Sequence, residues 1–145
     1  WRGLFSYVPQ GSQLLSGTVR QIVTFSDAPA ALDEPRIRQA LRIACAEDFV
    51  DALEQGLDTP LGERGAGLSE GQLQRLAIAR AVCSGTPIMV LDEVTSALDG
   101  KTEAAVLANI AALPEKTVFV AAHRVKAREF ATMRLRVDGG VVSAL

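Results

Sequence analysis

Two adjacent acidic residues, Asp92 and Glu93, follow an apolar run, Ile88–Leu91. Such a run predicts a strand buried on both faces, and carboxylates at its end are costly to bury unless they reach solvent or have a chemical role. Mg²⁺ in proteins is usually held by one or two carboxylates together with phosphate oxygens and water, which suits Asp92. Successive side chains of a strand point to opposite sides, so Glu93 could act on a water molecule. A strand that simply ends in a polar turn explains the pair equally well.

A second candidate site is the sequence Leu-Ser-Glu-Gly-Gln at residues 68–72. Ser69 stands where a helix N-cap is expected, and backbone N–H groups at the start of a helix attract anions. Gly71 would let a phosphate approach the backbone closely. An ordinary capped helix explains these five residues alone, and the site becomes the better interpretation only when the continuation, Leu73–Ala81, is read with them.

Hydrophobic periodicity and turn residues predict the elements that position these groups. Strands are expected at residues 1–8, 88–91 and 117–121, the last also buried. Helices are expected within 14–25, from 34 with Asp33 as its cap, at 47–55, 71–84, 101–113 and 124–131, with a loop at 57–67 and a hairpin of 133–138 and 141–143 that turns on Gly139-Gly140. Alternation of strand and helix in residues 85–145 favours a parallel α/β sheet.

Polar residues follow three of the predicted strands, namely Gln10, the pair Asp92 and Glu93, and His123. Ligands of α/β sheets bind beyond the carboxyl ends of the strands. The four residues are therefore expected to meet in one site.

The composition excludes several other classes of function. A net charge of −2 gives no indication of nucleic-acid binding by bulk charge. Cys45, Cys83 and a single histidine are too few ligands for a structural zinc site, so two reduced thiols are expected. No apolar stretch approaches the ~18 residues of a membrane-spanning helix, and there is no signal peptide. Because the chain begins at Trp1, already in a predicted strand, we interpret it as a piece of something longer, connected to a membrane only through another domain or subunit.

Taken together, the motifs resemble those of the ATP-binding-cassette (ABC) ATPases. Tyr7–Gln10 resembles the Q-loop, Leu68–Ala81 the signature motif and its helix, Ile88–Glu93 the Walker B strand with its catalytic glutamate, Ser96–Asp99 the D-loop, and Ala122–Arg124 the switch histidine. They occur in the family's order and at its spacing. Thr59–Gly65 and Leu15–Val19 are, in addition, similar to loops of exporter-type members.

The resemblance implies a fold and partners. The fold would be a partial P-loop NTPase-like parallel sheet with an inserted helical subdomain. Residues 1–11 would form the Q-loop strand of the ATPase core, residues 12–84 the helical subdomain with the signature motif, and residues 85–145 the C-terminal half of the RecA-like core. The partners would be a second ABC ATPase domain in a head-to-tail dimer and the transmembrane domains of an exporter, at the cytoplasmic face of the cell membrane, with no nucleic acid.

The same resemblance implies cofactors, ATP and Mg²⁺, and a role for each site residue. Asp92 would hold Mg²⁺ through water, Glu93 would polarise the attacking water as general base, and His123 would sense the γ-phosphate. Gln10 would touch the metal or the water and link the site to the membrane domain. Ser69, Gly71 and Gln72 of the signature would bind ATP held by the opposite subunit, and Asp99 would cross the same interface.

Some positions depart from the family pattern. The phosphate-binding pattern G-x-x-x-x-G-K-S/T is missing, because the G-K-T at Gly100 has Thr95 where the first glycine belongs. We therefore expect these residues alone to bind ATP weakly or not at all, to be inactive, and to expose apolar sheet surface that self-associates or rearranges near Trp1–Val8. Glu70 stands where many members have glycine. Ala131-Thr132 stands where exporters usually have Ala-Asp, so residues 125–145 identify little.

Three other interpretations remain. The chain could come from a degenerate nucleotide-binding subunit of a heterodimeric transporter, although Glu93, His123 and the full signature favour an active enzyme. It could come from a soluble ABC protein that acts on DNA or ribosomes, although Gly62–Gly65 and Ala122–Arg124 favour a transporter. Finally, the piece alone could be a folded module without catalysis.

Overall fold

A three-stranded parallel sheet forms the centre of the structure, a computed structural model that describes residues 2–11, 16–25, 33–62, 67–121 and 125–145. Its strands are β1 (Phe5–Val8), β4 (Ile88–Asp92) and β5 (Thr117–Ala121), in the order β1-β4-β5. In register, Tyr7 lies opposite Val90, and Val90 lies opposite Phe119. The parallel α/β sheet expected from the sequence is confirmed.

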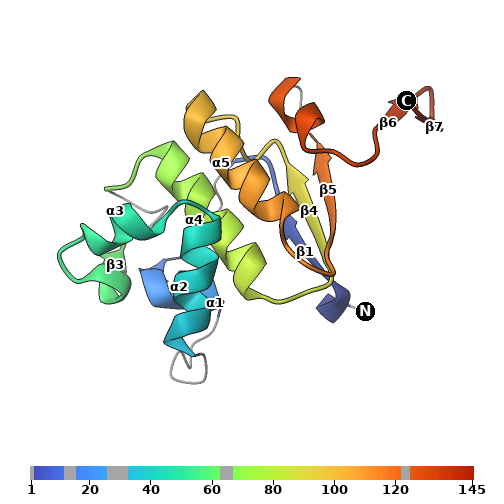
Figure 1. Ribbon diagram of the computed structural model, residues 1–145. Coiled ribbons are helices and arrows are strands. Elements are labelled where there is room, and N and C mark those ends of the chain that lie inside the picture. Colours follow the sequence, from blue (N-terminus) through green and yellow to red (C-terminus); the bar gives the residue numbers. More distant parts are fainter. Residues whose placement is uncertain (1, 12–15, 26–32, 63–66, 122–124) are drawn as a thin grey trace.

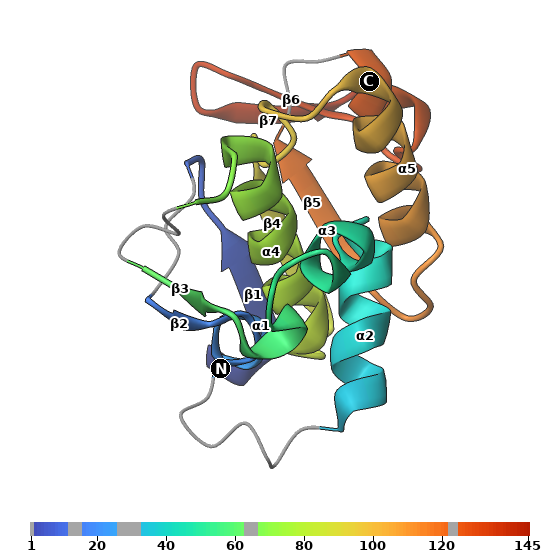
Figure 2. The same cartoon turned by 90° about the vertical axis from the view of Figure 1, so that its left-hand side faces the viewer.

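Two helices, α4 (Glu70–Cys83) and α5 (Gly100–Ala111), lie on the same side of this sheet in both views (Figures 1 and 2). On β4, Met89 and Leu91 are fully buried within the core that these helices share. The helices therefore cover one face of β1 and β4, whereas on the same face Val120 of β5, opposite Leu91, is still 39% exposed.

A layer of short helices packs on α4. It consists of α1 (Val19–Thr24), α2 (Glu34–Ile43) and α3 (Glu47–Asp51), with a 3-10 turn, η3 (Gly56–Asp58), after it. A small antiparallel pair, β2 (Gly17–Thr18) and β3 (Pro60–Leu61), closes the layer. Because α4 lies between the sheet and these helices, most of its residues from Leu76 to Cys83 are buried.

Side chains cap the starts of α1, α4 and α5 but not those of α2 and α3. Thr18 and Ser69 each form a capping box, with Gln21 and Gln72 respectively, so the prediction of Ser69 as an N-cap is confirmed. Asp33 lies at the N-cap of α2, but its side chain makes no capping hydrogen bond; here Pro35 in the first turn favours the helix instead.

The opposite face of the sheet corrects the prediction of strands buried on both sides. Phe5, Tyr7 and Phe119, which share that face by register, are 38%, 50% and 50% exposed. Within the described residues, helices cover only the other face (Figure 1), which explains why a continuous apolar run does not produce a fully buried strand here. Exposed apolar sheet surface was expected; self-association through it stays a prediction.

Several element boundaries also differ from expectation. A 3-10 turn, η1 (Arg2–Leu4), precedes β1, and the helix expected at 47–55 ends at Asp51. The helix expected at 124–131 is instead a 3-10 segment, η5 (Val125–Glu129), and the loop expected at 57–67 contains η3 and β3. Short 3-10 segments and two-residue strands leave no periodicity in a sequence.

The C-terminal hairpin is confirmed as β6 (Leu135–Asp138) paired with β7 (Val141–Ala144). Gly139 and Gly140 both have positive φ, 55° and 82°, as a tight two-residue turn requires. The hairpin projects away from the sheet (Figure 1).

Cys45 and Cys83 are unpaired thiols whose pKa values are raised by burial. None of the helices in the described ranges is long and apolar enough to cross a membrane.

Candidate functional site

The carboxyl ends of β1 and β4 bring the first group of candidate residues together. The side-chain amide of Gln10 donates a 2.8 Å hydrogen bond to the Glu93 carboxylate. The residue before Glu93 is held in a similar way: the Tyr7 hydroxyl of β1 donates a 3.1 Å hydrogen bond to the Asp92 carboxylate. The parallel pairing of Phe5–Val8 with Ile88–Leu91 makes both contacts possible, because it ends the two strands at the same edge.

Glu93 has an unusual backbone. Its φ of 50° lies in the left-handed region, which costs a residue with a side chain about 1–3 kcal/mol. Its N–H donates to the Ala121 carbonyl of β5 at 2.9 Å, and its carbonyl accepts from the Ser96 N–H at 3.2 Å. The chain thus leaves the sheet abruptly at Glu93: Asp92, the last residue of β4, still follows the alternation of the strand, whereas Glu93 does not.

The donor set at this edge fits a magnesium ion held mainly by its own water and phosphate ligands. Asp92 and Glu93 are only half-buried, and the neighbouring Gln10 is exposed. In the described part of the chain there is no group of three or more His, Cys, Asp and Glu side chains that could hold a metal. Mg²⁺ needs only one or two protein carboxylates, whereas tetrahedral zinc would need more ligands. Hydrogen bonding to Asp92, with some desolvation, raises the pKa of the Tyr7 hydroxyl.

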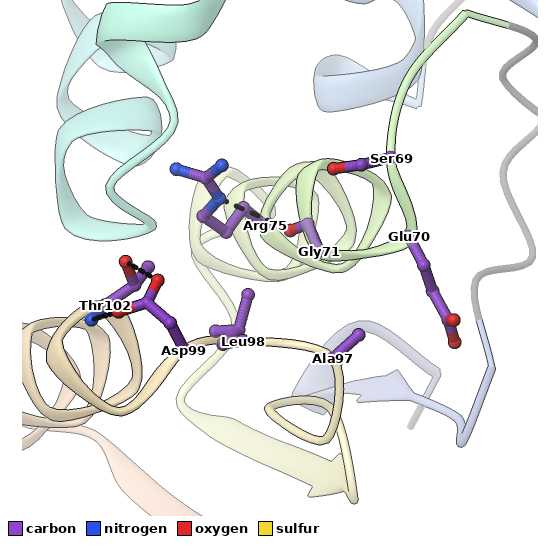
Figure 3. A pocket seen from close by; sticks show the side chains of 8 residues that line it. All are labelled: Ser69, Glu70, Gly71, Arg75, Ala97, Leu98, Asp99 and Thr102. Atoms are coloured by element: carbon purple, nitrogen blue, oxygen red, sulfur yellow. Dashed lines mark hydrogen bonds between the residues drawn. The ribbon is translucent and has the colours of Figure 1, made fainter.

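The second group of candidates lines an open pocket of about 460 Å³ between the start of α4 and the start of α5 (Figure 3). It is lined by Ser69, Glu70, Gly71, Arg75, Ala97, Leu98, Asp99 and Thr102. Ser69 and Gln72 serve each other as a capping box: the Ser69 hydroxyl accepts from the Gln72 N–H at 3.3 Å, and the Gln72 side chain accepts from the Ser69 N–H at 2.8 Å. The position of the serine hydroxyl at the pocket rim is therefore fixed by the helix itself.

Glycine is required at position 71 because another segment of the same chain lies close to its backbone. A Cβ at Gly71 would lie 2.9 Å from the Ala97 carbonyl oxygen and 3.4 Å from the Leu98 side chain. Figure 3 shows this start of α4 facing Ala97 and Leu98. The close approach expected of Gly71 is therefore made first to the chain's own loop 93–99, the segment from Glu93 to Asp99.

Asp99 is the N-cap of α5. Its carboxylate accepts hydrogen bonds from the N–H groups of Lys101 and Thr102 at 3.0 and 3.1 Å and from the Thr102 hydroxyl at 2.6 Å. These bonds, that of the Thr102 hydroxyl foremost, lower the pKa of Asp99 to about 2. Asp99 is also exposed at the pocket, so its helix-capping role leaves it at the surface.

Comparison with known proteins identifies the family. The family model described as "ABC transporter" matches residues 1–96, about two thirds of the chain. The chain belongs to the ABC transporter family. Its fold agrees with a solved bacterial Atm1-family ABC exporter with ATP bound, at a TM-score of 0.85 and 34% identity over 96% of this chain.

Curated relatives of this ABC chain are similar over nearly its whole length. It is 41% identical over 98% of its residues to a probable multidrug resistance ABC transporter ATP-binding/permease protein of Bacillus subtilis. It is 45% identical over 94% of its residues to an ATP-dependent lipid A-core flippase of Haemophilus ducreyi. The chain spans 24% of the length of each of these relatives and of the exporter structure.

The structure places most of the site residues proposed from ABC motifs in two groups. Gln10, Asp92 and Glu93 meet at the edge of the sheet, and Ser69, Gly71, Gln72 and Asp99 lie at or beside the pocket. His123 lies outside the described residues, as do residues 63–66 of the loop that resembles exporters. The order and spacing of the motifs predict the members of each group, but they do not predict which side chains within a group contact one another.

Four residues around these groups were missed from the sequence. Tyr7 contacts Asp92, and period-two alternation could have placed both on one face of the sheet. Gln74, Thr95 and Glu103 are buried polar residues, at 3%, 5% and 1% exposure. Helical spacing could have placed Gln74 on the inner face of α4, with Ala77, Ile78 and Ala81. The bond from the Thr95 hydroxyl to Glu103, 2.9 Å long, has no such signal.

Proposed function

We propose that this chain is the C-terminal part of an ATP-hydrolysing ABC domain that powers export across a membrane. The observation that carries the proposal is the 2.8 Å hydrogen bond from Gln10 to Glu93 beside Asp92, at the carboxyl edge of a parallel sheet. Hydrolysis of a phosphoanhydride requires a carboxylate that holds the metal and a carboxylate that acts on the attacking water, and here an amide holds the second carboxylate in place. The names of the multidrug and lipid A-core relatives favour export.

Each of these residues has a separate task in the proposed reaction. Asp92 holds Mg²⁺, which when bound neutralises charge that develops on the phosphate oxygens. Glu93 accepts a proton from the water that attacks the γ-phosphorus, while the bond to the β-phosphate oxygen breaks and ADP leaves. Gln10 holds the carboxylate of Glu93 in place. His123, by resemblance, contacts the γ-phosphate.

The second group of residues serves another subunit in this proposal. In a head-to-tail dimer of ABC domains, Ser69 and Gly71 at the start of α4, with Gln72 behind them, face ATP held by the partner, and Asp99 lies at the same interface. The pocket is open to solvent between α4 and α5, which supports its use as a docking surface. We assign residues 1–11 and 85–145 to the ATPase core, residues 12–84 to the helical subdomain, and the whole to the cytoplasmic face of the membrane, below the transmembrane domains.

The contact at Glu93 also favours an active domain over a degenerate one. A subunit that only binds nucleotide has no need for an acid in the strained backbone of Glu93, held by a dedicated amide.

The test is the variant Glu93→Gln in the exporter that carries this chain. Glutamine has the same shape and still accepts a hydrogen bond from Gln10, but it cannot take a proton. Since a general base contributes about 10²–10⁴-fold, we expect turnover of ATP to fall at least about 100-fold while ATP binding persists and traps an ATP-bound dimer.

The matched control is Glu115→Gln, the same change at an exposed acid far along the chain from both groups. Its turnover should equal that of the wild type. If Glu93→Gln hydrolyses ATP at the wild-type rate, Glu93 is not the general base.

A further inference from the structure

We propose that Gln74 is a positioning residue, which sets the place of Glu93 and Asp99 by holding loop 93–99 against the signature helix α4. The inference rests on the proposed ATPase function and adds to it a residue that touches neither ATP nor metal.

Both polar atoms of the Gln74 side chain bind this loop. Its amide nitrogen donates to the Ser96 hydroxyl at 3.0 Å, and its amide oxygen accepts from the Ala97 N–H at 3.1 Å. Gln74 is 3% exposed. A buried amide must find partners, and this one finds both on two successive residues of one loop.

The location of Gln74 makes a merely solubilising role untenable. It lies on the inner face of α4, whose other members, Ala77, Ile78 and Ala81, are buried and apolar. Burying an amide there is costly unless its hydrogen bonds are made, and an apolar side chain of the same length would fill the space without that condition. What the amide adds is a defined position for residues 96 and 97.

The rest of loop 93–99 is fixed at both ends, so Gln74 controls its middle. At the start, the Ser96 N–H donates to the Glu93 carbonyl. The Thr95 hydroxyl near the start also donates to the buried Glu103 carboxylate of α5 at 2.9 Å. At the end, Asp99 is held by the N–H groups of α5 that it caps. In the middle, the Ala97 carbonyl lies so close to Gly71 that a Cβ there would be 2.9 Å away. A shift of Ala97 towards Gly71 must therefore displace α4.

This arrangement joins the two groups of the site within one chain. Ser69 and Gly71 begin α4, Glu93 begins the loop and Asp99 ends it. In the proposed dimer the first pair meets the partner's ATP, whereas Glu93 acts on ATP of its own subunit. Gln74 thus connects the start of α4, which in the proposed dimer faces the partner's ATP, with Glu93, which acts on ATP bound to its own subunit.

The experiment is Gln74→Met in the full-length exporter, a change that keeps the length of the side chain and removes both hydrogen bonds. We expect kcat for ATP hydrolysis to fall about tenfold, since misplacements near 1 Å cost about 100-fold, while KM for ATP changes less than about twofold. The matched control is Asn109→Leu, which removes a half-buried amide that donates to the Ile43 carbonyl at 3.1 Å and to the Cys45 sulfur at 3.7 Å, both outside loop 93–99. Its kcat should stay within about twofold of the wild type.

A double variant separates positioning from general packing. Ser96→Ala removes one of the two partners, and because both changes break the same link, Gln74→Met with Ser96→Ala should be no slower than Gln74→Met alone. Ser96 is exposed, so Ser96→Ala tests the proposal even if Gln74→Met does not fold, with an expected fall in kcat of about threefold.

Unchanged kcat in Gln74→Met and Ser96→Ala, effects that multiply in the double variant, or an equal loss in Asn109→Leu would overturn the role of Gln74. Failure of the proposed function looks different: Glu93→Gln would then retain wild-type turnover, whatever the Gln74 variants do.

Discussion

A single added methyl group, in Gly71→Ala, probes the contact between the signature helix and loop 93–99. The new Cβ would lie 2.9 Å from the Ala97 carbonyl oxygen, where ordinary contact begins at 3.4 Å, so the two segments must separate by about 0.5 Å. The neighbouring atom is backbone, which cannot rotate away. Overpacking of this kind costs about 1–3 kcal/mol, and replacing glycine by alanine in a helix returns up to about 1 kcal/mol. The net loss of unfolding free energy is therefore about 0–3 kcal/mol.

The effect on catalysis should exceed the effect on stability. If a displacement of 1 Å costs about 100-fold, a displacement of half that size costs about tenfold, and this loss is expected in kcat for ATP hydrolysis by the full-length exporter. Gly3→Ala is the matched control, because a Cβ there meets nothing within 4 Å. Steady-state ATPase kinetics and thermal unfolding are measured on all three proteins. Wild-type kcat in Gly71→Ala would show that the close contact does not position the loop, and the reasoning would be refuted.

Two further predictions concern stability. Asp99→Ala should lower the melting temperature at pH 7. The pKa of Asp99 is held at about 2, below the ordinary value near 4, so the stabilisation by its carboxylate is complete above about pH 4 and disappears as pH falls through 2. The melting temperatures of the wild type and Asp99→Ala should therefore converge on acidification. Leu76→Ala, at a fully buried position of α4, should reduce the free energy of unfolding by about 2–5 kcal/mol, measured by urea denaturation against Leu135→Ala, whose side chain is 50% exposed.

The sequence predicts the covered face of this fold well, because that face follows simple periodicities. The start of α4 at Ser69 and the strand at 88–91 are confirmed, since a capping residue and an unbroken apolar run each depend on local chemistry. The exposure of β5 is not predictable in this way. Apolar composition predicts that a strand prefers burial, but whether a helix covers it depends on residues elsewhere.

The candidate site shows the same division between local and distant information. Motif spacing is enough to select Gln10, Asp92 and Glu93, because parallel strands end at a common edge. It does not reveal that Gln10 contacts Glu93 and that Tyr7 contacts Asp92, since these pairs depend on the register between strands more than 80 positions apart. A polar residue within an apolar helical stripe, such as Gln74, is a distant contact for which the sequence does carry a usable signal.

The buried polar residues of the described ranges are concentrated around loop 93–99, which connects the proposed base with the proposed intersubunit contact. Gln74, Thr95 and Glu103 are the chain's buried polar residues within the described ranges, and each of them binds loop 93–99 or lies in it. Apolar packing fills space but tolerates small displacements of its members, whereas a hydrogen bond fixes distance and direction. A loop that begins with the proposed base and ends at the proposed intersubunit contact needs the second kind of restraint. The location of these three residues is therefore better explained by positioning than by stability, because apolar side chains in their places would serve the core at least as well.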